Sequence, residues 1–333
     1  MNKIAIIGYN NQLSKNILEL LSLRGYGKNN ISVFETKVQG EPKVSFGEEE
    51  LIVKSLENAD VSGFDAVIFV GNNQAPSLYA KKFASQGIKV INATTALEGE
   101  ENIPLVVGGV NDNVFDKAQN IINIPQPSIV QLLGAIAGLC GKYSLKNIRL
   151  TSFVAADFEG QDGMSELYNR TRRILMNDVS SNESGLFHKT LAFNVIPQVG
   201  SFIGEETYNE WLYNSQIKQV LSSDIRVHAN CTFVPSFVGT GQFVNIETNE
   251  DIDADEARED IKKAKGVLVL DRQEDGGYAT LTDVQGESSV FVSRIRQDMT
   301  VENGISLWIA GDTYKIAAQN ILAVLKQFLK KDK

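Results

Sequence analysis

The sequence predicts an α/β protein in which a Rossmann-like, doubly wound parallel sheet is joined to an α+β domain with a broad, mainly antiparallel sheet. The chain has 333 residues, about twice the usual length of one domain. Short apolar runs alternate with helical patterns near the N-terminus, whereas strand-like runs dominate the second half. We therefore expect one domain from residues 1–128 and 312–333, and a second from residues 129–311.

The first domain is expected to begin with a strand, a turn and a helix. The apolar run Lys3 to Gly8 stops at a glycine, and Gln12 to Leu23 carries leucine and isoleucine at helical spacing. A second helix is expected from Tyr79 to Gln86, closed by Gly87. Further strands are expected at Ile31 to Phe34, Phe64 to Val70, Ile88 to Ile91 and Leu105 to Val107. This alternation is typical of a parallel sheet with helices on both faces.

The second domain is expected to open with a long helix from Ile129 to Leu139. Strand-like runs follow at Asn147 to Ala155, Arg226 to Val234, Gln242 to Thr248, Val267 to Leu270, Val290 to Ile295 and Ile305 to Ala310. Long polar connections, such as Met176 to Ser184, separate them, as in α+β domains. A helical period from Tyr314 to Leu329 predicts a C-terminal helix.

The composition excludes several classes of partner. Lys and Arg number 32 against 41 Asp and Glu, which gives a net charge of −9 and a pI near 5.0. Such a chain is unsuited to nucleic acid or to an anionic membrane surface. The longest apolar stretch, Leu132 to Cys140, is far shorter than the ~20 residues that span a bilayer. Two cysteines, Cys140 and Cys231, suit a reducing compartment, so we expect a cytoplasmic protein.

Several blocks of sequence resemble one known family over essentially the whole chain. They are Ile103 to Val107 with Val110-Asn111, Ala192 to Gln198, Arg294 to Arg296 with Asp298, and Val301 to Gly304 leading to Leu307-Trp308. In this order they are similar to aspartate-semialdehyde dehydrogenases. The resemblance implies the two-domain fold and a homodimer joined through the second domain. In that family a cysteine attacks the aldehyde, hydride passes to NADP, and phosphate releases the acyl group.

The nucleophile and the base of the family are both replaced. The family motif Asn-Pro-Asn-Cys-Ser-Thr corresponds to residues 124–129, so Pro127 stands at the cysteine position. Proline has no nucleophilic atom, but it suits the first turn of a helix. The histidine of the family's Gly-His-Ser corresponds to Thr240, which cannot shuttle a proton near neutral pH.

The residues that hold substrate and phosphate are replaced as well. By the same resemblance, the glutamine that helps to order the reacting groups corresponds to Val154, and the arginine that pairs with the substrate carboxylate corresponds to Phe233. The glutamate that contacts the substrate amine corresponds to Asn209. The lysine and the arginine that bind phosphate correspond to Leu212 and Glu98. The resemblance therefore implies a catalytically inactive relative, most similar to the Usg-type paralogues of the family.

We find no substitute catalytic group in the sequence. His228 and Cys231 are three residues apart on a predicted strand, which sends their side chains to opposite faces, so Cys231 is expected to be a buried structural thiol. His188 is expected at a surface or an interface. Asp157, Glu159 and Glu210 are acidic residues near the former cleft, but the sequence does not pair them. The two histidines and two cysteines do not cluster as a metal site.

The dinucleotide site also departs from the family pattern. Gly8 is retained, but Asn11 places a side chain where a pyrophosphate needs bare backbone. Glu35, at the end of the second strand, would accept the ribose hydroxyls of NAD and repel a 2′-phosphate, or is equally well a solvated strand end. Gly71 ends the third apolar run, and Thr313 replaces an asparagine of the family's nicotinamide-closing motif. We expect no required cofactor and at most weak binding of NAD.

Three functional hypotheses remain open from the sequence. The first is a binding or regulatory protein without the family's reaction. The second is an NAD-linked oxidoreductase of remodelled specificity, with aspartate-semialdehyde dehydrogenase activity itself supported by family analogy only. The third is a scaffold or a subunit of a complex with another protein. The sequence identifies neither a small ligand nor a protein partner.

Overall fold

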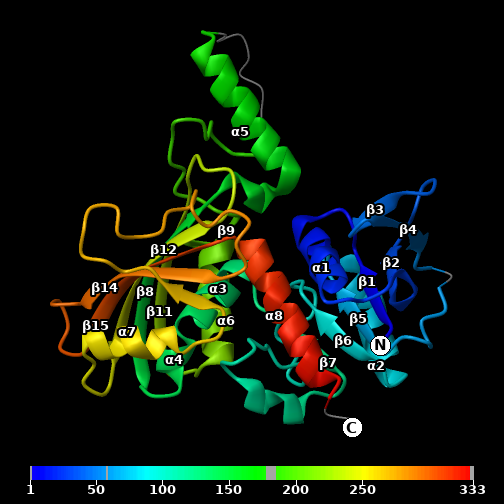
Figure 1. The fold of residues 1–333 in the computed structure, drawn as a ribbon, viewed down its shortest axis with the longest axis horizontal. Coiled ribbons are helices and arrows are strands. Elements are labelled where there is room, and N and C mark those ends of the chain that lie inside the picture. Colours follow the sequence, from blue (N-terminus) through cyan, green and yellow to red (C-terminus); the bar gives the residue numbers. More distant parts are fainter. Residues whose placement is uncertain (1, 58, 178–184, 331–333) are drawn as a thin grey trace. The chain divides into compact units, whose positions relative to one another are not determined.

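A computed structural model describes residues 2–57, 59–177 and 185–330, and the chain divides into two compact units (Figure 1). Unit 1 comprises Met1–Val130 with Tyr314–Lys333, and unit 2 comprises Gln131–Thr313. Most of the polar connection predicted from Met176 to Ser184 lies outside the described residues. Within the described ranges, none of the helices combines the length and apolar character needed for a bilayer span.

Unit 1 is built on a seven-stranded sheet of order β3-β4-β2-β1-β5-β6-β7. Its strands are β1 (Ile4–Ile7), β2 (Ile31–Glu35), β3 (Lys43–Phe46), β4 (Glu49–Ser55), β5 (Ala66–Phe69), β6 (Lys89–Asn92) and β7 (Ile121–Asn123). All adjacent strands are parallel except the β3–β4 pair. The helices are α1 (Gln12–Leu23), α2 (Gln74–Ser85) and α8 (Thr313–Phe328), with short turns η1 (Lys28–Asn30) and η2 (Asp112–Lys117). The predicted Rossmann-like sheet is confirmed.

Three details of unit 1 differ from the prediction. The helix α2 begins at Gln74, ahead of the predicted start at Tyr79. Leu105 to Val107 does not form a strand and makes only one bridge, between Leu105 and Asn123, because the chain turns away at Gly108 and Gly109. The edge is instead taken by β7. The β3–β4 hairpin is also not among the elements expected from the sequence, although β4 alternates buried Leu51 and Val53 with exposed residues, as a half-buried strand does.

Unit 2 contains a six-stranded sheet of order β11-β8-β12-β15-β14-β13. Its strands are β8 (Leu145–Val154), β11 (Arg226–Phe233), β12 (Thr240–Thr248), β13 (Val267–Val269), β14 (Val290–Gln297) and β15 (Gly304–Gly311), and β9 (Phe202–Ile203) pairs separately with β10 (Glu206–Thr207). The four central strands are antiparallel, whereas β11 and β13 join the edges in parallel. The predicted α+β domain with a broad, mainly antiparallel sheet is confirmed.

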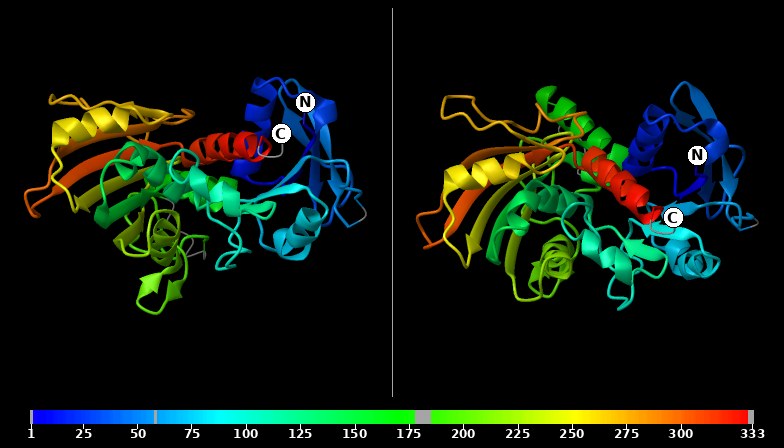
Figure 2. Two further views of the ribbon diagram at one scale, coloured as in Figure 1. Left: turned by 90° about the horizontal axis from the view of Figure 1, so that it is seen from below. Right: turned by 60° about the horizontal axis from the view of Figure 1, so that its bottom comes forward.

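Helices cover one face of this sheet. They are α3 (Pro127–Ala135), whose C-terminal part belongs to unit 2, α4 (Ala137–Cys140), α6 (Tyr208–Val220) and α7 (Ala254–Lys262). After β8, η3 (Ala156–Glu159) and α5 (Gly160–Leu175) pack on each other, and α5 points away from the sheet (Figure 1). The helix α6 packs against β11, and α7 packs against β13 and β14 (Figure 2). Burial alternates along β8, where Ile148, Leu150 and Ser152 are buried while Arg149 is exposed. On the other face, Ala279 and Val284 pack against Phe291, Trp308 and Ala310, whereas Phe243 remains 44% exposed.

The long helix predicted from Ile129 to Leu139 is divided at Ile136 into α3 and α4. The division allows close packing of α4, because a Cβ on Gly138 would lie 2.1 Å from the carbonyl oxygen of Asp260. Only glycine permits this approach between α4 and α7.

Candidate functional site

The sheet register of unit 2 brings together three of the positions that the family resemblance marks as catalytic. Phe233 on β11 pairs with Val154 on β8, Val154 pairs with Thr240 on β12, and Thr240 pairs with Gly311 on β15. Neighbouring strands lie about 4.8 Å apart, so these residues form one row across the end of the sheet. The row is the centre of the candidate site.

Phe233 is the first member of this row, and it is packed among other aromatic rings. Its ring centre lies 5.1 Å from that of Phe187 and 5.8 Å from that of Phe158, and both pairs are close to perpendicular. Phe233 is only 5% exposed. At the position where the resemblance places a substrate-binding arginine, the chain therefore has an apolar, edge-to-face packed core.

Thr240, at the histidine position, belongs to a buried hydrogen-bond network of neutral side chains. The members are Gln131, Ser152, Tyr213, Thr240, Gln242 and Thr313. Thr313 donates through Oγ1 to Thr240 Oγ1 at 2.9 Å, and Gln131 Nε2 donates to the carbonyl oxygen of Thr240 at 2.9 Å and to Gln242 Oε1 at 3.1 Å. Gln242 Nε2 donates to the hydroxyl of Tyr213 at 2.7 Å, which lies 3.1 Å from Ser152 Oγ. None of these six side chains is a histidine, a carboxylate or an amine.

The helix α6 contributes two further positions, Asn209 and Leu212, and both side chains are buried. Glu210, which lies between them in the sequence, accepts hydrogen bonds from two backbone N–H groups. One carboxylate oxygen accepts the backbone N–H of Thr207 at 2.8 Å in a capping box, and the other accepts the backbone N–H of Cys231 at 3.0 Å. Glu210 therefore joins the start of α6 to β11.

Neither thiol of the chain can supply a nucleophile near neutral pH. Burial raises the pKa of Cys140 to about 12. Burial, helped by the Glu210 carboxylate, also raises the pKa of Cys231 to about 12. His228 is exposed while Cys231 is buried, which confirms that they lie on opposite faces of β11. His188 is exposed, and no cluster of metal-ligating residues occurs among the residues that the structure describes.

Asp157 is a buried carboxyl group beside the row. Its Oδ2 accepts the backbone N–H of Gly239 at 3.1 Å, and burial together with the negative charge of Asp312 raises its pKa to about 7. Asp157 follows β8 and Asp312 follows β15, so they flank the strand that begins at Thr240. The sequence marked Asp157 as a candidate but could not supply this arrangement, which depends on strand register. Glu159 instead lies near His188, whose charge opposes the rise in pKa that burial causes.

Unit 1 holds the predicted dinucleotide turn after β1. Gly8 has φ +99°, and a Cβ there would lie 2.0 Å from the carbonyl oxygen of Val70, so only glycine fits. Asn11 is the N-cap of α1, and its Oδ1 accepts the backbone N–H of Ser14 at 2.8 Å. Glu35 Oε1 accepts the backbone N–H of Thr36 at 2.9 Å at the end of β2. Both side chains are thus engaged in local hydrogen bonds with the backbone that follows them.

The remaining predicted positions lie outside the row. Pro127 is the first residue of α3, as predicted for a helix start. Glu98 lies in the turn after β6, where its backbone N–H donates to the carbonyl oxygen of Thr95. Thr313, predicted from the cofactor motif, lies in unit 2 within the neutral network.

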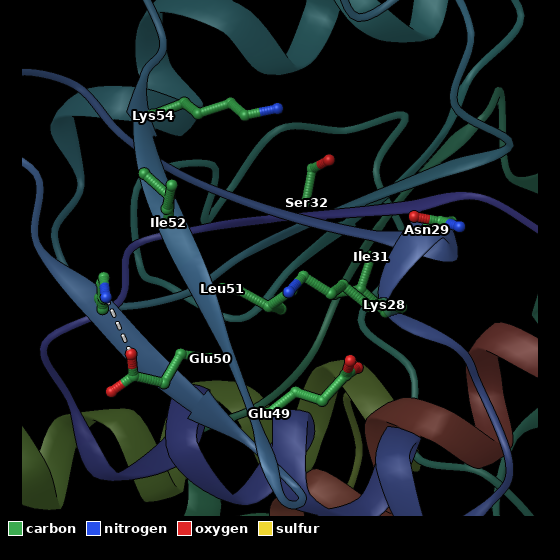
Figure 3. Close-up of a pocket in the computed structure, with 10 residues that line it drawn as sticks. Lys28, Asn29, Ile31, Ser32, Glu49, Glu50, Leu51, Ile52 and Lys54 are labelled. Atoms are coloured by element: carbon green, nitrogen blue, oxygen red, sulfur yellow. Dashed lines mark hydrogen bonds and ion pairs between the residues drawn. The ribbon is translucent and has the colours of Figure 1, made fainter.

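A separate depression of about 660 Å³ lies on unit 1 beside β2 and β4 (Figure 3). Its walls carry Lys28, Lys54 and Glu49, and an ion pair of 3.0 Å between Lys43 and Glu50. It contains none of the residues that the sequence marked, and its mixed charges define no class of ligand.

Two family descriptions match the chain. Residues 3–118 match the semialdehyde dehydrogenase NAD binding domain, and residues 136–314 match the semialdehyde dehydrogenase dimerisation domain. The two matches follow the order of the units.

Individual proteins match over nearly the full length. The aspartate-semialdehyde dehydrogenase of Rickettsia bellii (strain RML369-C) is 30% identical over 332 residues, which cover 98% of this chain and 97% of that protein. That of Aquifex aeolicus (strain VF5) is 28% identical and covers 98% of both chains. A crystal structure of aspartate semialdehyde dehydrogenase II from Vibrio cholerae, complexed with ASA, has a TM-score of 0.92 at 25% identity and covers 99% of this chain and 98% of that one.

Proposed function

We propose that this chain, which belongs to the semialdehyde dehydrogenase family, is a catalytically inactive member similar to the Usg-type paralogues and acts as a cytoplasmic binding or scaffold protein. It would act by binding a small ligand or a protein partner, without oxidising a semialdehyde. No cofactor is required for such a role, and NAD would bind at most weakly.

The row Phe233, Val154 and Thr240 carries this proposal. An anionic substrate needs a cation or several hydrogen-bond donors, but Phe233 offers an aromatic ring packed against Phe158 and Phe187. A thioester mechanism needs a thiolate and a base, but both thiols have pKa values of about 12. Loss of a nucleophile alone leaves residual catalysis from the rest of a site, whereas here the supporting groups are replaced too.

The test is an assay for phosphate-dependent oxidation of aspartate semialdehyde, with NAD and with NADP. The protein should be produced in a host that lacks its own enzyme. We expect no turnover above a control without protein, and none after Pro127→Cys, because a restored thiol still lacks a base and a substrate anchor. Turnover by the unaltered protein, abolished by its heat denaturation, would refute the proposal.

The same proposal includes a homodimer formed through unit 2. The face of its sheet opposite the helices carries an aromatic cluster in which the ring centre of Phe243 lies 4.7 Å from that of Trp308 and 6.0 Å from that of Phe153. Phe243 is 44% exposed. A partly exposed aromatic cluster on a sheet face is typical of an interface centre, and the match of residues 136–314 to a dimerisation domain supports a second copy as the occupant.

One observation favours the second candidate, an NAD-linked oxidoreductase of remodelled specificity. Asp157, with a pKa of about 7, lies next to Gly239 and Thr240, where the family has its base. A carboxyl group with such a pKa suits proton transfer near neutral pH. This candidate requires a dinucleotide, so ultraviolet absorbance and mass spectrometry of the purified protein separate it from the first.

A further inference from the structure

The side chain of Asn11 spans two glycine turns of unit 1. Its Oδ1 accepts the backbone N–H of Ser14 at 2.8 Å, which closes the first turn of α1. Its Nδ2 lies 3.1 Å from the point that a Cβ on Gly71 would occupy. The carboxamide therefore reaches from the turn after β1 to the turn after β5.

These two turns enclose the ligand position of a doubly wound sheet. The strands β1 and β5 are neighbours, with Ile7 paired to Phe69, and the strand order reverses between them, since β2 lies on the far side of β1. In such sheets a ligand binds at the carboxyl ends of the strands where the order reverses, and its phosphates meet the free N–H groups of the following helix.

We infer that the Asn11 carboxamide occupies the place of a pyrophosphate and excludes dinucleotides from this turn. Its oxygen takes a backbone donor that a phosphate would use, and its nitrogen fills the space left by the absent Cβ of Gly71. Gly8 and Gly71 retain a backbone without side chains, with φ of +99° and +90°, as a phosphate-binding turn requires. The space that a phosphate would fill is taken by the Asn11 side chain.

Two neighbouring groups add to this effect. Ser14 is fully buried behind the turn, and its hydroxyl finds no hydrogen-bond partner, so it does not help to hold an anion at the surface. Glu35 places a carboxylate at the end of β2, which disfavours a 2′-phosphate more than a ribose hydroxyl. A site opened at Asn11 should therefore prefer NAD to NADP.

The inference deepens the proposed function and rests on it in one respect: a chain that performs no hydride transfer can close its cofactor turn without loss of function. Exclusion of the dinucleotide is nevertheless a property of unit 1. It is tested by measuring dinucleotide binding, separately from any test of semialdehyde oxidation.

The test is calorimetric titration with NAD, NADP and adenosine of the wild-type chain and of Asn11→Gly. Glycine removes the carboxamide and frees the N–H of Ser14. We expect NAD to bind Asn11→Gly about tenfold more tightly than the wild type, or more, which is the effect of recovering one charge-assisted hydrogen bond. Adenosine, which has no pyrophosphate, should bind both proteins equally.

Two further variants control for folding and flexibility. Asn10→Gly loosens the same turn at a neighbouring, exposed side chain and should leave NAD binding unchanged. Asn11→Ser retains an N-cap oxygen but is too short to reach Gly71, so it should give an intermediate affinity in a stable helix. Equal NAD affinity of wild type and Asn11→Gly, or micromolar binding by the wild type, would overturn the inference. Turnover of aspartate semialdehyde would instead contradict the proposed function.

Discussion

The carboxylate of Asp157 accepts the backbone N–H of Gly239 at 3.1 Å, and this bond joins the end of β8 to the residue before Thr240. The bond holds a carboxyl group in a buried part of unit 2, close to the charge of Asp312. The protein thus has, beside Thr240, a buried carboxyl group that ionises with difficulty.

The first prediction is that Asp157 makes the protein less stable as the pH rises. Its pKa is about 7 in the folded chain and about 3.8 when exposed, so between these pH values the folded state binds the proton more tightly than the unfolded state. The free energy of unfolding should therefore fall between about pH 4 and 7. At a pH of about 8, Asp157→Asn should be more stable than the wild type, by up to about 4 kcal/mol.

Urea unfolding at about pH 5 and about pH 8 measures this effect. The amide oxygen introduced by Asp157→Asn would still accept the Gly239 N–H, so the comparison isolates the ionisation. Asp283→Asn is a suitable control, because this exposed carboxyl group has a lowered pKa and its loss should not raise stability at the higher pH. Equal pH dependence in the wild type and in Asp157→Asn would show that the carboxyl group ionises normally.

The second prediction concerns Phe233, whose ring packs between Phe158 and Phe187. Phe233→Ala should lower the free energy of unfolding by about 3–5 kcal/mol, because it leaves a cavity among buried rings. Phe233→Arg, which introduces the residue that the resemblance places here, should cost at least as much, since the guanidinium would be buried among aromatic rings.

Phe202 provides the control for this series, because it is also a phenylalanine of unit 2 but is 63% exposed. Phe202→Ala should change stability by less than about 1 kcal/mol. If Phe233→Arg were as stable as the wild type, a counter-ion or solvent would have to reach this position, and the argument for a filled substrate pocket would fail.

Much of the fold could be predicted because it depends on local pattern. The run before Gly8 and the period from Gln12 to Leu23 match β1 and α1 closely, since a buried parallel strand is apolar throughout and an amphipathic helix repeats its apolar residues. The helix α5 is not among the elements expected from the sequence, although its apolar residues, among them Met164, Leu167 and Leu175, recur at helical spacing. Only Gly163 and Leu167 of this helix are buried.

Less of the candidate site than of the fold could be predicted from the sequence. The resemblance marks Thr240 and Phe233, but their neighbours come from distant segments: Phe187 lies on a loop, and Thr313 follows β15. The raised pKa of Asp157 likewise depends on burial and on Asp312, which approach it only through the sheet register. Such properties arise from tertiary structure, and no local pattern carries them.

The third prediction is that both thiols resist alkylation in the folded protein. Cys140 and Cys231 have pKa values of about 12, so almost no thiolate exists near neutral pH. Mass spectrometry after treatment with iodoacetamide should find unmodified protein under native conditions and both cysteines modified in urea. Rapid native labelling of Cys231 would indicate an accessible, ionised thiol and would reopen the question of a nucleophile in unit 2.

The fourth prediction concerns the homodimer, and it depends on the partly exposed aromatic cluster around Phe243 in unit 2. Sedimentation at low micromolar concentration should give a species of about twice the monomer mass of 36.6 kDa. Phe243→Glu places a charge in the aromatic cluster with Trp308 and Phe153, where an apposed copy would exclude water. We expect this variant to be monomeric, because burying an unpaired carboxylate costs several kcal/mol.

Ile52→Glu is the matched control, since Ile52 is 50% exposed on β4 of unit 1, outside the sheet that carries Phe243. It should remain dimeric. A far-UV spectrum and a thermal transition of Phe243→Glu distinguish dissociation from unfolding: a folded monomer supports the interface, because Phe243 is partly exposed and its replacement need not disturb the core. A wild-type chain that sediments as a monomer would leave the aromatic cluster as packing within one chain, and a dimeric Phe243→Glu would place the interface on another surface.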